Sequence, residues 1–154
     1  GGFVGFFSET SGGQTTTKGD VVIPRYNFTI PSTGNYVLGH EFGHVMYHHL
    51  AEFDQPACKK VLSMYQTASR MGNTLDHYAA TSASEYMAQC NEAYLALYKP
   101  HIELIHNNDP ENIAFHTKST LKRKDPEMYK FIDNLYKTYS EKALQEAKPV
   151  NLFA

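Results

Sequence analysis

The stretch Val37-Leu38-Gly39-His40-Glu41-Phe42-Gly43-His44-Val45-Met46 decides how this chain is interpreted. Its apolar residues recur at helical spacing, and Ser32 or Thr33 can cap a helix over residues 34–50. Residues four apart on a helix lie one turn apart on the same side. His40 and His44 therefore project from one face, close enough to bind one ion through two imidazole nitrogens.

Glu41 lies beside this face, where its carboxylate can reach a water on the metal without ligating the metal. The pattern His-Glu-x-x-His thus predicts a metal site with a base next to it. The alternative is a solvated face of histidine and glutamate. Histidines on two consecutive turns facing one way need partners for their ring nitrogens, which favours the metal site.

A catalytic zinc ion usually has three protein ligands, so a third ligand is needed. The third histidine of the metzincin pattern is absent, because Tyr47 and Leu50 stand where that pattern needs Gly and His. His48 lies one turn beyond His44, but a helix curving around one ion cannot easily present three successive turns. The remaining source is a carboxylate from a later helix, and the best segment is residues 78–88.

Residues 78–88 read Tyr-Ala-Ala-Thr-Ser-Ala-Ser-Glu-Tyr-Met-Ala. Together with the upstream His-Glu-Phe-Gly-His, this segment resembles the gluzincin-type zinc peptidases of the anthrax lethal factor group, and is similar to the Pro-Pro endopeptidases and the titration-factor peptidases. The resemblance covers residues 37–98. It implies that Glu85 completes a Zn2+ site with His40 and His44. It further implies that Glu41 is the catalytic base and that Tyr78 points its hydroxyl at the reacting carbonyl.

Glu85 also has a purely structural interpretation. Ser82 and Glu85 fit a capping box, in which the glutamate secures the start of a helix. Glu92 competes for the ligand role, but it lies two turns further along the same stripe, about 10 Å by helix rise, and cannot share the ion with Glu85. It could instead accept a proton from a ligand imidazole.

Other residues near the predicted site bear on its interpretation. His77 and Tyr86 are neighbours that could replace Tyr78. Gln89 departs from the resemblance, since many relatives carry an acidic residue there, and this affects the partners of the ligands. Gly43 costs about 1 kcal/mol relative to Ala inside a helix, so we expect that a side chain there would hold off the helix that brings Glu85 in.

The remaining sequence predicts a single domain over residues 1–154 with an α+β fold, in which a small N-terminal β-sheet packs on a mainly helical zincin-like domain. Strands are expected at residues 3–7, 21–23 and 26–30, and helices at 56–72 and 83–98. Asp-Pro-Glu at 109–111 and at 125–127 predicts two further helix starts. An extended peptide substrate could lie along the strand at 3–7 or at 21–23.

Composition narrows the function classes. The chain has 14 basic and 16 acidic residues, which argues against a nucleic-acid or anionic-membrane binder, and no apolar run could span a membrane. Cys58 and Cys90 lack metal-ligand spacing and are expected as free thiols. The chain begins without Met or a signal peptide, which is typical of an excised or mature fragment of a longer chain. Analogy favours a secreted or effector-type protein, expected to be a monomer.

The expected function is a zinc-dependent endopeptidase that hydrolyses peptide bonds of a protein substrate. Zinc would lower the pKa of its bound water, Glu41 would take the proton as that water attacks, and zinc with Tyr78 would stabilise the oxyanion. The alternative is a catalytically inactive zinc-binding interaction module of peptidase descent, and a third class is a purely structural helical domain without metal.

Overall fold

The computed structural model describes residues 5–7, 14–15, 21–23, 37–95, 100–101, 114–115 and 117–146. Five helices are described: α2 (Val37–Phe53), α3 (Gln55–Met71), α4 (Ala83–Leu95), α5 (Lys118–Lys124) and α6 (Pro126–Glu146). The described strands are β1 (Gly5–Phe7), β2 (Gln14–Thr15), β3 (Val21–Ile23), β4 (Pro100–His101) and β5 (Ala114–Phe115).

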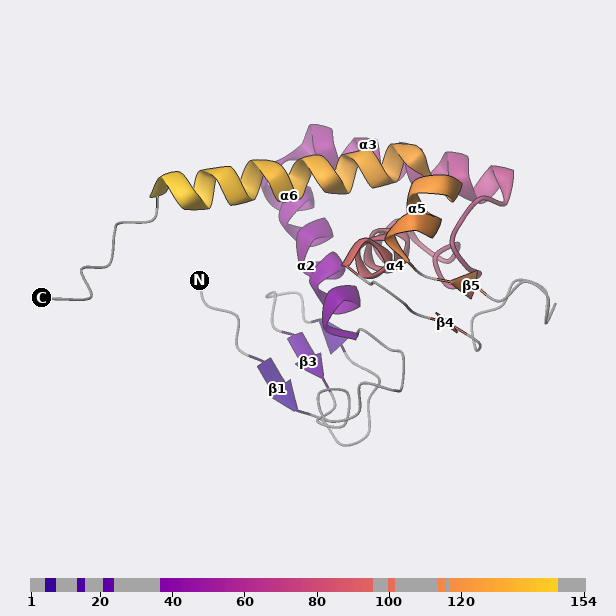
Figure 1. The fold of residues 1–154 in the computed structure, drawn as a ribbon, viewed down its shortest axis with the longest axis horizontal. Coiled ribbons are helices and arrows are strands. Elements are labelled where there is room, and N and C mark those ends of the chain that lie inside the picture. The colour runs from indigo at the N-terminus through magenta and orange to yellow at the C-terminus, as the bar shows by residue number, and fades with distance from the viewer. Residues whose placement is uncertain are drawn as a thin grey trace, which may run out of the picture.

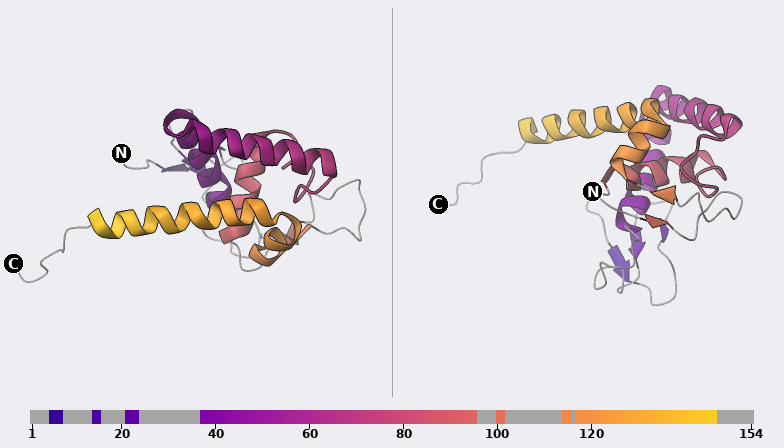
Figure 2. Two further views of the ribbon diagram at one scale, coloured as in Figure 1. Left: turned by 90° about the horizontal axis from the view of Figure 1, so that it is seen from above. Right: turned by 45° about the vertical axis from the view of Figure 1, so that its right-hand side comes forward.

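The helices form two layers (Figure 1). The helices α3 and α6 make the upper layer, and α2 and α4 lie beneath them, with α5 beside α4. The two further views confirm that α3 and α6 run over the same side of the bundle and that the last turns of α6 extend beyond it (Figure 2). The close pairing of α2 with α4 matters most here, because these two helices carry the candidate site.

Helix boundaries follow the chemistry of their end residues. Asp54 precedes α3 and its carboxylate accepts from the Ala57 N–H at 3.1 Å, while Pro56 occupies the first turn. Gly72 ends the helix in the left-handed conformation, with φ of 67°. Asp125 caps α6 by accepting from the Met128 N–H at 3.0 Å. These ends confirm the helix predicted over residues 56–72 and the helix start predicted at 125–127. The predicted start at 109–111 lies outside the described residues.

The helix α4 is the centre of the described core. Its side chains from Tyr86 to Ala93 are all buried, as expected for a helix surrounded by other helices. The core around it draws from every other helix, and its larger members are Leu50, Val61, Met64, Leu75, Tyr86, Met87, Leu121, Met128, Phe131 and Ile132. Burying each such side chain contributes roughly 1.5–3 kcal/mol. The position of α4, and of any side chain on it, is therefore fixed by packing on several sides.

The predicted α+β fold is wrong, because the described core is built entirely by helices and by the turn that precedes α4. The strands contain only two or three residues each. Segments this short place one or two side chains on a face, too few to form a layer, whereas typical strands have about five or six residues. The segment at 26–30 lies outside the described residues, as do the residues beyond 95 in the helix expected over 83–98.

The short strands still correct one expectation about a substrate. In the first sheet the order is β1-β3-β2, with β1 parallel and β2 antiparallel to β3. The strand β3 is thus paired on both sides, and residues 21–23 cannot offer the free edge that was expected of them. Of the two strands considered for a substrate, β1 alone lies at an edge.

Two further predictions can be compared with the described residues. Cys58 and Cys90 are free thiols, as expected; Cys58 is half-buried and Cys90 fully buried. Burial raises the pKa of the Cys90 thiol well above its ordinary value, with a further contribution from Asp125. None of the helices that the structure describes is long and apolar enough to cross a membrane.

Candidate metal centre

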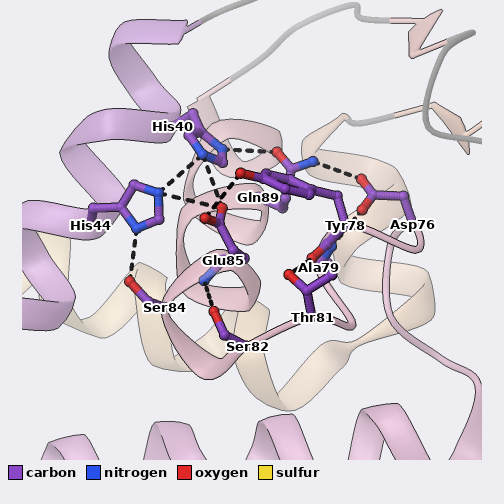
Figure 3. A network of polar contacts seen from close by, with 10 residues as sticks. All are labelled: His40, His44, Asp76, Tyr78, Ala79, Thr81, Ser82, Ser84, Glu85 and Gln89. Carbon is purple, nitrogen blue, oxygen red and sulfur yellow. Dashed lines mark hydrogen bonds and ion pairs between the residues drawn. The ribbon is translucent and has the colours of Figure 1, made fainter. Parts of the chain in front are cut away.

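Three side chains from two helices meet at one point (Figure 3). The helix α2 supplies His40 and His44, and the first turn of α4 supplies Glu85. The Nε2 atoms of the two imidazoles are 3.1 Å apart, and the Oε2 atom of Glu85 lies 3.2 Å from one and 3.4 Å from the other. The three residues are close enough together to hold a metal ion.

The two oxygens of Glu85 have different surroundings. Its Oε1 atom accepts a hydrogen bond from the Tyr78 hydroxyl at 3.0 Å. Its Oε2 atom is buried, faces the two imidazoles and has no hydrogen-bond partner among the residues that the structure describes. Burial by itself would raise the pKa of this carboxyl group, but its polar interactions with the imidazoles of His40 and His44 outweigh burial and lower the pKa to about 2. Glu85 is therefore an anion aimed at the point where the imidazoles meet.

Each imidazole also has a partner for its other ring nitrogen. The Nδ1 atom of His40 lies 3.0 Å from Oε1 of Gln89, and the Nδ1 atom of His44 lies 2.8 Å from the hydroxyl of Ser84. The amide of Gln89 in turn donates to the Asp76 carboxylate at 2.9 Å. With Nδ1 used in this way, each imidazole presents Nε2 to the common point, which is how histidine ligands are oriented in metal sites.

The approach of α4 to α2 depends on Gly43. A Cβ atom at this position would lie 2.5 Å from the Cα atom of Ala88 and 3.1 Å from Cβ of Asn91. The sequence prediction that a side chain here would hold off the Glu85 helix is confirmed. Asn91 also connects the helices, since its amide donates to the carbonyl of Gly39 at 2.7 Å.

The structure distinguishes the capping role of Glu85 from its role facing the histidines, and it separates Glu85 from the competing residues Glu92 and His48. Ser82 does cap α4, because its hydroxyl accepts from the Glu85 N–H at 3.1 Å. The capping bond uses the backbone of Glu85, and its side chain faces the histidines, so the two roles use different atoms. Glu92 is buried elsewhere on α4 and His48 is exposed, and neither belongs to the metal-holding group found in the described residues.

Tyr78 lies at the open side of the site. Its ring stacks on that of His40 with centroids 6.0 Å apart, and its side chain is partly exposed. Burial, followed by the charge of Glu85 and the hydrogen bond to it, raises the Tyr78 pKa to about 12. The hydroxyl is thus a hydrogen-bond donor at neutral pH. Tyr86 cannot take the place of Tyr78, because it is buried in the core and its hydroxyl donates to Asp125. The side chain of His77 is exposed.

Glu41 follows His40 on α2 and is only 4% exposed. Its carboxylate lies near enough to the Tyr78 hydroxyl that its negative charge adds to the rise of the tyrosine's pKa. Of the five residues predicted for the site, the structure brings His40, His44, Tyr78 and Glu85 into contact, and Glu41 directly follows His40 on α2.

Two residues of this neighbourhood were not predicted from the sequence. Ser84 directly precedes Glu85, and its position in the first turn of α4 could have indicated a contact with α2. Asp76 lies in the turn between α3 and α4, where its carboxylate also accepts from the Ala79 N–H at 2.6 Å. Its sequence context is typical of a turn residue, and carries no sign of a link to His40.

In comparisons with known protein families, curated proteins and solved structures, the chain matches none of them. The resemblance to the lethal factor group stays a prediction from the two motifs.

Proposed function

We propose that this chain is a zinc-dependent endopeptidase that uses His40, His44 and Glu85 as metal ligands. The proposal rests on one observation. The Nε2 atoms of His40 and His44 and the Oε2 atom of Glu85 form a triangle with edges of 3.1, 3.2 and 3.4 Å. A tetrahedral zinc ion with bonds of about 2.0–2.1 Å keeps its ligand atoms about 3.3 Å apart. The buried Oε2 atom, without a hydrogen bond among the described residues, fits the same ion.

The chemistry of the ligand set also supports zinc. Two imidazoles and one carboxylate are a common set in catalytic zinc sites, which keep a further position open for water or substrate. Sites with only structural zinc usually use four protein ligands, often thiolates. The described residues offer no fourth His, Cys, Asp or Glu within this group. An open position is what a hydrolytic site requires.

A bound zinc ion would supply Lewis acidity, which polarises a peptide carbonyl and makes water easier to deprotonate. Glu41 would accept a proton from the water whose oxygen attacks the carbonyl carbon. The Tyr78 hydroxyl, protonated at neutral pH, would donate a hydrogen bond to the oxygen that becomes negative. The carbon–nitrogen bond would then break, and Glu41 would return its proton to the leaving amine.

The substrate in this proposal is a peptide or protein. The site lies between α2 and α4 with Tyr78 partly exposed beside it, so a polypeptide could reach it from outside. The edge strand β1 is the remaining candidate for backbone pairing with an extended peptide.

The experiment is cleavage of a mixed peptide library by the purified full chain, with bound zinc quantified. Glu41→Gln should keep its zinc and lose turnover by about 100-fold or more, because the base contributes about that much. Glu52→Gln is the matched control, since Glu52 is an exposed glutamate on the same helix. Zinc without turnover in every form would favour an inactive zinc-binding interaction module instead. Wild-type chain that binds no zinc would refute the proposal.

A further inference from the structure

The buried turn before α4 carries an acidic residue whose contacts lead to the metal centre. We propose that Asp76 is a positioning residue, which acts through the side-chain amide of Gln89 to fix the orientation and the tautomer of His40. The inference rests on the proposed function in one respect only, that His40 binds a metal through Nε2.

The three groups form a continuous chain of polar contacts, in which Asp76 and Gln89 are buried and His40 is partly buried (Figure 3). Asp76 is 0% exposed and Gln89 is 1% exposed. The Gln89 amide nitrogen lies 2.9 Å from Oδ2 of Asp76, and the Gln89 amide oxygen lies 3.0 Å from Nδ1 of His40. The other carboxylate oxygen of Asp76 accepts from the Ala79 N–H at 2.6 Å. The carboxylate is thus held at one end by backbone and meets the amide at the other.

The direction of the hydrogen bonds in this chain follows from the chemistry of its groups. An ionised carboxylate only accepts hydrogen bonds, so the Gln89 amide must turn its NH2 group toward Asp76. Its carbonyl oxygen then faces His40, and an oxygen can only accept from Nδ1. His40 must therefore carry a proton on Nδ1, which leaves Nε2, beside His44 and Glu85, as the nitrogen that can bind a metal. That is the tautomer that binds a metal through Nε2.

The other ligand imidazole has no such constraint. Nδ1 of His44 contacts the Ser84 hydroxyl at 2.8 Å, and a hydroxyl can either donate or accept. Ser84 is therefore compatible with both tautomers of His44. Among the two histidines, only His40 has its proton position imposed by a buried charge, and the residue that imposes it is Asp76.

Asp76 could also act only on the fold, because its bond to the Ala79 N–H is that of a turn-capping residue. The variant Asp76→Asn helps to distinguish this structural role from the positioning of His40. The new amide can still accept from Ala79, but its NH2 group then faces Gln89 and forces that amide to reverse. The Gln89 NH2 group would meet Nδ1 of His40, so that the His40 proton moves to Nε2 and weakens metal binding through that nitrogen.

The test is zinc affinity, measured by competition with a chelator, for the full chain and for Asp76→Asn, Gln89→Glu and the double variant. We expect Asp76→Asn to weaken zinc binding about 10- to 100-fold, as for other residues that support a metal ligand. The double variant should return to within a few-fold of wild type, because the carboxylate at position 89 accepts both from the amide at position 76 and from His40. Turn capping alone predicts no such rescue.

Two controls keep the result interpretable. Asp54→Asn alters a capping aspartate remote from the site, and should leave zinc affinity unchanged. Gln89→Met removes the link without touching the Asp76 bond to Ala79, and should also weaken zinc binding because the acceptor for Nδ1 of His40 is lost. Long-range 15N NMR of the metal-free chain in alkaline buffer reports the protonation of Nδ1 directly, with a proton on Nδ1 of His40 expected in wild type and none there in Asp76→Asn.

The outcomes separate the two proposals. If wild type binds zinc and neither Asp76→Asn nor Gln89→Met changes the affinity, the role of Asp76 is refuted while the metal centre stands. Loss of affinity in Asp76→Asn without recovery in the double variant also refutes it, in favour of turn capping. A wild-type chain without zinc removes the proposed function and this inference with it.

Discussion

The Cα atom of Ala88 lies 2.5 Å from the position that a Cβ atom on Gly43 would take. Real side chains do not come this close to a backbone atom, so α2 and α4 touch here at their main chains. Gly43 lies between His40 and His44 in the sequence, and Ala88 lies one turn after Glu85. The contact therefore sets the distance between the two imidazoles and the carboxylate.

Gly43→Ala should destabilise the fold, although alanine is the better helix former. Helix propensity alone would stabilise α2 by about 1 kcal/mol. Overpacking against Ala88 should instead cost about 1–3 kcal/mol and move Glu85 away from the histidines. Urea unfolding and a zinc titration measure the two effects. A variant that is more stable than wild type and binds zinc equally well would show that the helices can separate without consequence.

Tyr78→Phe should reduce peptide turnover by roughly 100- to 1000-fold, because it removes one donor to the developing oxyanion. Zinc content should stay at the wild-type level, since Tyr78 contacts the ligand Glu85 but is not itself a ligand in this account. Tyr94→Phe is the control, because it removes a hydroxyl that donates to Asp133, away from the site. Equal turnover in Tyr78→Phe and wild type would exclude the hydroxyl from catalysis.

Asn91 joins three helices through its buried amide, which donates to the Gly39 carbonyl at 2.7 Å and accepts from the Tyr136 hydroxyl at 3.0 Å. Asn91→Asp should lower the free energy of unfolding by at least about 1–3 kcal/mol, because an acceptor then faces the carbonyl of Gly39. Tyr136→Phe keeps that bond and should cost less. Chemical denaturation of both variants orders the two effects, and the reverse order would contradict this assignment.

The stability of the fold should fall in alkaline solution partly because of Cys90. Burial, and then the charges of Asp125 and Asp76, raise its pKa above the ordinary value of 9.0, so the unfolded chain loses this proton first. The stabilising contribution is complete below about pH 9 and is lost as the pH rises above it, with a slope of about 1.4 kcal/mol per pH unit. Cys90→Ala should have a shallower loss of unfolding free energy above this pH.

Cys58→Ala controls for the removal of a thiol as such, because Cys58 is only half-buried. An alkaline slope that is the same in Cys90→Ala and wild type would show that the buried thiol does not contribute.

Much of the site could be predicted from local sequence. The spacing of His40 and His44 fixes their common face on any helix, and the helix-interior Gly43 indicated a close packing contact. Glu85 and Tyr78 came from the resemblance of a second motif, which no spacing rule would have supplied. Asp76 could not be predicted, because its link to Gln89 spans 13 residues and depends on how the turn before α4 folds.

The fold class was the larger error, and its reason is physical. Val21 and Val22 do lie in a strand, as predicted, but whether a strand joins a packed layer depends on burial against neighbours that a local pattern does not show. The described strands are short and the core belongs to the helices. Helix ends were predictable because Asp54, Gly72 and Asp125 act through bonds to their own neighbours.

The most direct test of the central claim is an anomalous diffraction map, recorded at the zinc edge from crystals of the zinc-loaded chain. The account predicts a peak about 2.0–2.1 Å from Nε2 of His40, Nε2 of His44 and Oε2 of Glu85. No peak between these three atoms, or zinc bound only elsewhere, would contradict it.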